Sequence, residues 1–227
     1  MLDRDKCVGC GACLEVCTHS QPGELGGALS LPTKEIECEA LFELVRPQLE
    51  MFKNNGGITL SGGEALLQAE EVKRLLILCK QHGISTCVES SFTLPEGPYR
   101  MVSEYTDYWL AGMRDIKFGM GDEKNDKEVV EKIKLVSLKA KKIIARYPLI
   151  GGYTTQQKQL DRYRLLMAAA GIHDIELMKC NPNMLHYYQL SGMNCGLSLT
   201  DILTTEEQWQ EAQYYFMDHG FHVTANE

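Results

Sequence analysis

The chain has 227 residues, of which 44% are hydrophobic and 24% are charged, and 23 Lys and Arg against 31 Asp and Glu give a net charge of −8. This composition supports one folded domain of ordinary size and argues against a nucleic-acid binder, which usually presents a basic face. No apolar run approaches the roughly 20 residues of a membrane-spanning helix. The first residues lack the apolar core of a signal peptide, so we expect a cytoplasmic location and no membrane partner.

The chain begins with a cysteine-rich segment, and the expected iron–sulfur head and its linker cover residues 1–34. Nine cysteines are present, and four of them are spaced Cys-x2-Cys-x2-Cys-x3-Cys, namely Cys7, Cys10, Cys13 and Cys17. This spacing is that of one half of a bacterial ferredoxin and predicts a [4Fe–4S] cluster. Structural zinc is the weaker alternative, because a second pair of ligands is missing. The fourth thiolate of the cluster is either Cys17, folding back, or Cys38.

From about residue 35 onward, helix-like and strand-like segments alternate about five times, which predicts a parallel sheet with crossover helices over residues 35–227. The expected helices are 35–53, 64–82, 96–106, 124–142, 155–170 and 204–219, and the expected strands are 58–60, 84–90, part of 108–117, 143–150, 175–180 and 221–225. Such sheets carry their chemistry at the carboxyl ends of the strands.

The most informative strand end is Ser61-Gly62-Gly63-Glu64, which follows the short strand 58–60. Two glycines before a helix start expose backbone groups to a ligand, and Glu64 could accept a hydrogen bond from a ligand ammonium group. The plainer interpretation is that Glu64 only stabilises the helix dipole.

Further strand ends extend this pattern into a resemblance. Glu89-Ser90-Ser91 ends the next strand, Asp115-Ile116-Lys117 a later one, and Arg146-Tyr147-Pro148-Leu149-Ile150-Gly151-Gly152 the one after that. With the turn at 61–64, these segments resemble the radical S-adenosylmethionine (SAM) activating enzymes of glycyl radical enzymes, over about residues 3–190. Residues 3–17 resemble the second half of the two-cluster ferredoxin insert of that family. The fold that the resemblance implies is α/β, an incomplete parallel (βα)6-type radical SAM barrel that lacks its first strand, with a small ferredoxin-like Fe–S head.

The resemblance also implies a set of SAM-binding residues. The turn would hold the amino group of SAM, a monovalent cation would lie beside the SAM carboxylate, and an arginine would lie near the bound molecule. An asparagine stands where the family usually has a histidine. The implied residues are Ser61, Gly62, Gly63 and Glu64 for the amino group, Glu89, Ser90, Met113 and Asp115 for the cation, and Lys117, Arg146 and Asn181 for other contacts.

The family's defining Cys-x3-Cys-x2-Cys segment is missing from this sequence. Those three thiolates leave one iron open to SAM, so we assign no catalytic residue and expect an N-terminally shortened chain. The full family uses the reduced cluster to cleave SAM to methionine and a 5′-deoxyadenosyl radical, which removes a hydrogen atom from a backbone glycine of the partner.

The resemblance implies a glycyl radical enzyme as partner, a flavodoxin- or ferredoxin-type electron donor, and an anaerobic setting. Two other functions stay open: a ferredoxin-like electron-transfer or SAM-binding module without radical chemistry, and a radical SAM enzyme that acts on a small molecule. At the level of single residues, Asp115 and Lys117 could form only a surface pair. Arg146 could be the structural ion-pair partner of Glu89 or Asp115.

Overall fold

A computed structural model describes residues 8, 10–16, 35–52, 54–112, 123–191, 196, 198 and 202–226 of the chain. Six parallel strands form one sheet, and their order in the sheet is their order in the sequence. Each described strand therefore lies beside its successor, which is the usual arrangement of consecutive strands. The strands are β1 (Gly57–Leu60), β2 (Ser85–Ser90), β3 (Tyr108–Ala111), β4 (Lys142–Leu149), β5 (Asp174–Lys179) and β6 (His222–Asn226).

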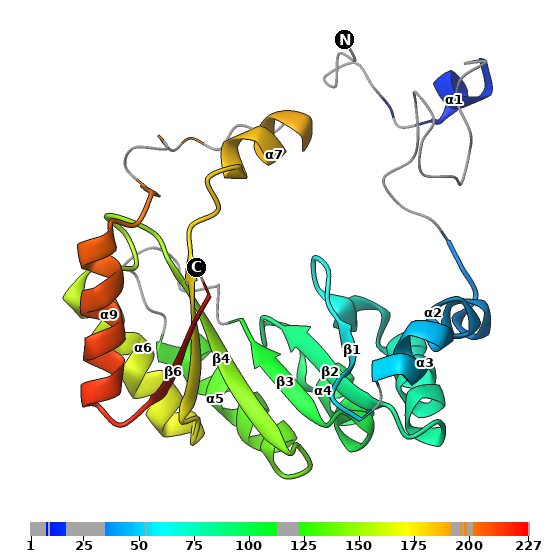
Figure 1. Ribbon diagram of the computed structural model, residues 1–227, viewed down its shortest axis with the longest axis horizontal. Coiled ribbons are helices and arrows are strands. Elements are labelled where there is room, and N and C mark those ends of the chain that lie inside the picture. Colours follow the sequence, from blue (N-terminus) through cyan, green and yellow to red (C-terminus); the bar gives the residue numbers. More distant parts are fainter. Residues whose placement is uncertain are drawn as a thin grey trace.

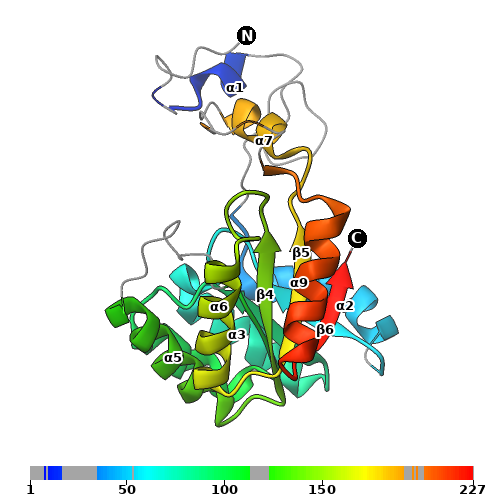
Figure 2. The same ribbon diagram turned by 90° about the vertical axis from the view of Figure 1, so that its left-hand side faces the viewer.

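Helices connect the strands and pack against one another in a row along the sheet (Figure 1). Figure 2 shows α6 and α9 at one end of this row, beside β4, β5 and β6. The helices are α1 (Ala12–Val16), α2 (Cys38–Phe52), η1 (Ala65–Gln68), α3 (Ala69–Gln81), α4 (Glu96–Val102), η2 (Ser103–Tyr105), α5 (Glu123–Ser137), α6 (Gln157–Ala170), α7 (Met184–Ser191) and α9 (Glu206–Asp218).

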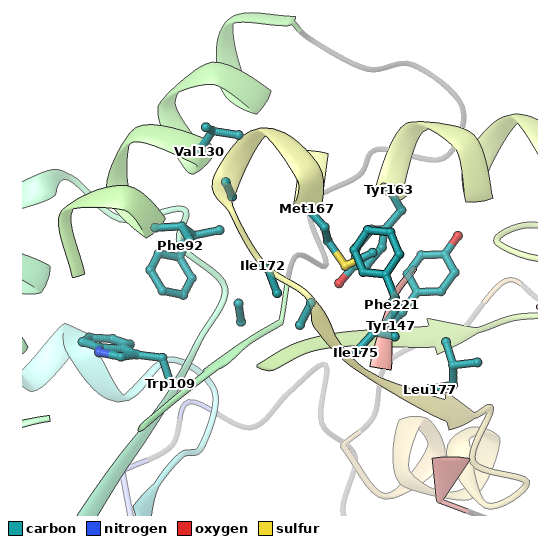
Figure 3. Close-up of a cluster of buried hydrophobic side chains, with 14 of the residues drawn as sticks. Phe92, Trp109, Val130, Tyr147, Tyr163, Met167, Ile172, Ile175, Leu177 and Phe221 are labelled. Carbon is teal, nitrogen blue, oxygen red and sulfur yellow. The ribbon is translucent and has the colours of Figure 1, made fainter. Parts of the chain in front are cut away.

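The two faces of the sheet differ in chemistry because side chains alternate along each strand. Val88, Ala111 and Leu177 point toward the helices and are fully buried in the main core. Figure 3 shows the aromatic part of this core, which includes Trp109 and Tyr147. The opposite, concave face carries polar and charged side chains that are only partly buried, which makes it the face available for chemistry.

The predicted fold class is confirmed: the described chain is an α/β structure with a six-stranded parallel sheet, open between β1 and β6. The six predicted helices are present, but several of their bounds differ from the prediction, and two of the differences have a local cause. The helix predicted over 64–82 starts as the short η1, because the Glu64 side chain accepts a hydrogen bond from the Leu66 backbone. The helix predicted over 124–142 ends at Ser137, because the Lys141 backbone leaves the helix and bonds to Asp107 of the neighbouring strand end.

Several predicted ligands lie outside the described residues, namely Cys7, Cys17, Met113, Asp115 and Lys117. Helix α7 was not predicted, and its sequence carries little amphipathic pattern to indicate it. Among the described helices, none combines the length and the apolar character that a membrane span requires.

Candidate functional site

The candidate site lies where β1 and β2 end. These strands are parallel, with Leu60 paired to Val88, so their carboxyl ends meet at one edge of the sheet. The turn 61–64 leaves β1 at that edge, and Ser90 and Ser91 leave β2 beside it. Glu64 reaches across from the first turn to the second, and this contact is the centre of the site.

The two oxygens of the Glu64 carboxylate have different surroundings. Oε2 accepts three hydrogen bonds, from the Ser90 hydroxyl at 3.0 Å, the Ser91 backbone N–H at 2.9 Å and the Ser91 hydroxyl at 2.8 Å. Oε1 accepts one long bond, from the Leu66 backbone N–H at 3.3 Å. Each oxygen of a carboxylate offers about two acceptor positions, so Oε1, which accepts a single long bond, is the oxygen with a position left for a donor from a ligand.

The glycine turn beside Glu64 is open on its outer side. Gly62 has a φ of +133°, a backbone conformation that side chains other than glycine rarely adopt. A Cβ atom built on Gly62 or Gly63 would meet no heavy atom of the described chain within 4 Å. A groove of about 790 Å³ lies between β1, α2 and α3 and reaches the turn at Ser61, while the two glycines and Glu64 do not line it. That volume falls within the range of small-molecule sites.

Ser91 belongs to a loop with a strained backbone. Phe92 has a φ of +59° and is the one described residue other than glycine with a positive φ. Such a conformation costs a bulky residue about 1–2 kcal/mol. Full burial of its ring, which stacks on Tyr99 at a centroid distance of 4.9 Å and lies 5.6 Å from Trp109, offsets that cost (Figure 3 shows Phe92 and Trp109). Strain that the surroundings hold in place often marks a functional site.

A second charged group lies on the concave face. The Arg146 guanidinium of β4 contacts Glu89 of β2 at 2.9 Å and Glu176 of β5 at 2.6 Å. Burial alone would lower the pKa of Arg146, but the two carboxylates outweigh burial and raise that pKa. The ion pair of Arg146 with Glu89, which the sequence left open as an alternative to a ligand contact, is thus present. The three side chains together carry one positive and two negative charges.

Two of the four residues that the resemblance assigns to a monovalent cation have partners within the described chain. Glu89 is engaged with Arg146, and the Ser90 hydroxyl is 3% exposed and donates to Glu64. The other two implied ligands, Met113 and Asp115, lie outside the described residues. The cation site therefore stays a prediction from the resemblance.

Asn181 is placed apart from the Glu64 group. It follows β5 and is exposed, and its Oδ1 accepts a hydrogen bond from the Asn183 backbone N–H at 2.9 Å. This bond shapes the turn that leads into α7, so the side chain has a local role. The structure does not bring Asn181 together with Glu64 or Arg146.

The expected cluster ligands are described only in part. Cys10, just before α1, and Cys13, within it, are both exposed. Cys38 is different: it is buried in α2, and its thiol contacts the Glu71 backbone carbonyl at 3.8 Å. Burial and the nearby Glu39 carboxylate raise the pKa of the Cys38 thiol. Because iron binds the thiolate, this environment argues against Cys38 as the fourth ligand.

Sequence reasoning missed two residues of the site. Glu176 lies between Ile175 and Leu177, both fully buried, so strand alternation alone places it on the concave face. The segment that carries the resemblance includes Ser91, but nothing in the sequence indicates its two hydrogen bonds to Glu64. Contacts between loops that follow different strands can be identified only once the register of those strands is known.

Comparisons with known proteins show which sequences and folds this chain resembles. A family model for a 4Fe-4S binding domain matches residues 1–19. The chain is 34% identical over 154 residues to the (2S)-3-sulfopropanediol dehydratase activating enzyme of Klebsiella oxytoca, a match covering 66% of this chain and 46% of that relative, so about half of the relative's length is spanned. The pyruvate formate-lyase 2-activating enzyme of Escherichia coli (strain K12) is 24% identical over 217 residues, covering 91% of this chain and 73% of the relative.

A solved structure shares the fold. It is a domain of a pyruvate-formate lyase-activating enzyme from Bacteroides vulgatus ATCC 8482, which aligns with a TM-score of 0.57 at 20% identity and covers 76% of this chain and 100% of that domain. At this identity the solved structure shows a shared fold only. The similarity to activating enzymes rests on the sequence matches. The chain is therefore a relative of the radical SAM activating enzymes of glycyl radical enzymes.

Proposed function

We propose that this chain serves in the activation of a glycyl radical enzyme, through reductive cleavage of SAM and hydrogen abstraction from a backbone glycine of that partner. The sequence kinship with activating enzymes supports the reaction class. The remaining acceptor position on Glu64 Oε1 carries the assignment of the SAM site. The partner is a glycyl radical enzyme, and a flavodoxin- or ferredoxin-type protein is the proposed electron donor.

The described residues fit the chemistry of SAM. Its amino acid part carries an ammonium group, for which Glu64 Oε1 is an acceptor with remaining capacity. Its sulfonium is a second cation, and the concave face offers two carboxylates to one guanidinium at Glu89, Glu176 and Arg146. The open outer side of Gly62 and Gly63 gives a ligand access to the backbone of the turn.

The protein's own contribution is to position and to shield. Ser90 and Ser91 hold Glu64 Oε2, so the carboxylate needs no reorientation when the ligand enters. Glu89 of β2 and Glu176 of β5 contact Arg146 from the two sides of β4. The [4Fe–4S] cluster and SAM, when bound, supply the one-electron chemistry. Cys7, Cys10, Cys13 and Cys17 are the residues proposed to hold the cluster.

The experiment that tests this function is equilibrium dialysis of SAM against the reconstituted chain under anaerobic conditions. Glu64→Gln keeps the shape of the side chain and removes its charge, so we expect the Kd for SAM to rise about tenfold, the loss of one charge-assisted hydrogen bond. Glu70→Gln is the matched control, because Glu70 is an exposed carboxylate in the first turn of the adjoining α3. Failure of the wild-type chain to bind SAM, or equal affinity in Glu64→Gln, would contradict the proposal.

A second candidate is a ferredoxin-like electron-transfer module without radical chemistry of its own. The observation in its favour is that the 4Fe-4S family model matches the segment with the cysteine run. A chain of this kind would take up iron and sulfide and transfer electrons without any dependence on SAM. Binding of SAM by the wild-type chain separates the two functions, because neither predicts much 5′-deoxyadenosine from this chain.

A further inference from the structure

The loop that holds Glu64 rests on a buried layer that the proposed chemistry does not use. Phe92, at its strained φ of +59°, donates its backbone N–H to the Ser90 hydroxyl at 3.2 Å. Its ring stacks nearly parallel on Tyr99, with an interplanar angle of 8°. Tyr99 is fully buried, and its hydroxyl lies 3.2 Å from the same Ser90 hydroxyl. The Ser90 hydroxyl, which contacts Glu64, is thus held by Phe92 and Tyr99.

A buried lysine contacts the C-terminal end of this loop, at Leu94. Lys132 of α5 is 8% exposed, and its Nζ donates to the Leu94 backbone carbonyl at 2.9 Å. The same Nζ lies 5.8 Å from the centre of the Tyr99 ring, within reach of a cation–π contact. Burial lowers the pKa of Lys132. Keeping its ammonium group charged at this position therefore costs free energy of folding. A lysine among Val130, Ile133 and Val136 is unexpected on a helix face that packs against the core.

We propose that Lys132 is a positioning residue for Glu64, because its bond to Leu94 fixes the loop 91–94 and thereby keeps Ser91 on Glu64 Oε2. Oε1 then points toward the ligand's amino group. This inference rests on the proposed function, in which Glu64 receives SAM. It extends that function to a residue on a different helix, which reaches the site only through the loop.

The mechanical reason is the conformation of Phe92. A bulky residue at a positive φ can relax to the ordinary negative region when its surroundings allow it. That relaxation would turn the Ser91–Phe92 peptide, break the bond from the Phe92 N–H to the Ser90 hydroxyl, and loosen the loop that holds Ser91 on Glu64. Lys132 at one end and the Ser90 hydroxyl at the other hold the loop against this change.

The test measures the Kd of two ligands: SAM, and its desamino analogue, which keeps the adenosyl group, sulfonium and carboxylate. Lys132→Met keeps the apolar stem and removes the ammonium group. We expect about a tenfold rise in the Kd for SAM, the effect of a weakened hydrogen bond to the ligand, and no change for the analogue, which has no amino group for Glu64. Lys134→Met is the matched control, since Lys134 is exposed on the same helix.

The two ligands separate positioning from damage to the fold. An equal loss for both ligands would show a merely structural role and overturn the inference, as would unchanged SAM affinity in Lys132→Met. If Lys132→Met does not fold, as judged by its thermal melt, Tyr99→Phe is the second variant, because it removes only the hydroxyl beside Ser90. It must then show the same selective loss. Absence of SAM binding in the wild-type chain would instead refute the proposed function itself.

Discussion

Ser91 donates two hydrogen bonds to one oxygen of Glu64, from its backbone N–H at 2.9 Å and from its hydroxyl at 2.8 Å. These bonds join the loop after β2 to the turn after β1. They hold the carboxylate while its second oxygen keeps acceptor capacity. A site arranged in this way binds a cationic group without first having to reorganise.

Ser91→Ala removes the hydroxyl bond and leaves the backbone bond, so Glu64 should be held less firmly. We expect the Kd for SAM to rise between about threefold and tenfold, the usual effect of one hydrogen bond. Isothermal titration calorimetry measures this change. Ser103→Ala is the control, because the exposed Ser103 hydroxyl contacts only the Arg100 backbone. Unchanged SAM affinity in Ser91→Ala would show that Glu64 needs no support from this loop.

Arg146→Met should destabilise the fold as well as the site. The variant leaves Glu89 and Glu176, which are 15% and 14% exposed, without the guanidinium that both contact. We expect a loss of about 2–3 kcal/mol in the free energy of unfolding, somewhat less than for a fully buried pair. Urea titration measures it.

Two further variants test the electrostatic reason for the loss in Arg146→Met. Arg146→Met combined with Glu176→Gln should recover part of the stability, because the second substitution removes one of the two carboxylates that lost the guanidinium. Arg100→Met should change little, because Arg100 and its partner Glu96 are both exposed. A double variant less stable than Arg146→Met would contradict the electrostatic explanation.

Acid stability should depend on Asp107, which lies at the edge of the sheet opposite the candidate site. Burial alone would raise the pKa of Asp107, but hydrogen bonds from Lys80, Lys141 and the Thr86 backbone outweigh burial and lower that pKa to about 2, from an ordinary value of 3.8. A lowered folded-state pKa stabilises the fold above pH 4, and this stabilisation is lost as the pH falls from 4 to 2.

The measurement compares urea unfolding of the wild-type chain and Asp107→Asn at several pH values. The pH-dependent part of the difference should be about 1–2 kcal/mol, allowing for screening of the two partly exposed lysines. That part should disappear near pH 2, and SAM affinity at neutral pH should be unchanged in the variant. A difference in stability that stays constant from pH 6 to pH 2 would show that the ionisation of Asp107 contributes nothing.

The cysteine assignments predict opposite effects for two substitutions. Cys13→Ala should reduce the iron and sulfide bound after anaerobic reconstitution, because Cys13 belongs to the ferredoxin-like run. Cys38→Ala should leave the bound iron unchanged, because Cys38 is buried in α2 and its thiol pKa is raised. Iron and sulfide analysis per chain measures both. Equal losses in the two variants would make Cys38 the fourth ligand.

Reductive cleavage of SAM by this chain depends on an iron open to the sulfonium. The sequence has no Cys-x3-Cys-x2-Cys segment to provide one, so the reconstituted, dithionite-reduced chain should form little 5′-deoxyadenosine. It should nevertheless bind SAM at Glu64. Multiple turnovers would mean that the run from Cys7 to Cys17 itself presents an open iron. Absence of both turnover and binding would favour the plain electron-transfer module.

The strands could be predicted from the sequence because each is a short apolar or alternating run between turn residues. The runs 84–90, 143–150 and 175–180 agree with β2, β4 and β5 to within one residue at each end. The turn at Glu64 could be predicted because the glycines and the carboxylate are adjacent in the sequence.

Other features needed the packed structure. Phe92 gives no sign of a positive φ, since that conformation normally indicates glycine. The contact of Arg146 with Glu176 depends on the register that pairs these two residues across β4 and β5. The bond from Lys132 to Leu94 joins positions 38 residues apart. Local patterns predict elements and turns, while contacts between elements depend on how the sheet is assembled.

A crystal structure of the chain with SAM tests the central claim most directly, through the position of the ligand's amino nitrogen. We predict that this nitrogen lies within hydrogen-bonding distance of Glu64 Oε1, while Oε2 keeps its bonds to Ser90 and Ser91. An amino group bound away from Glu64, or a Glu64 side chain that has left Ser91 to reach the ligand, would contradict the claim that this turn is a preformed site for SAM.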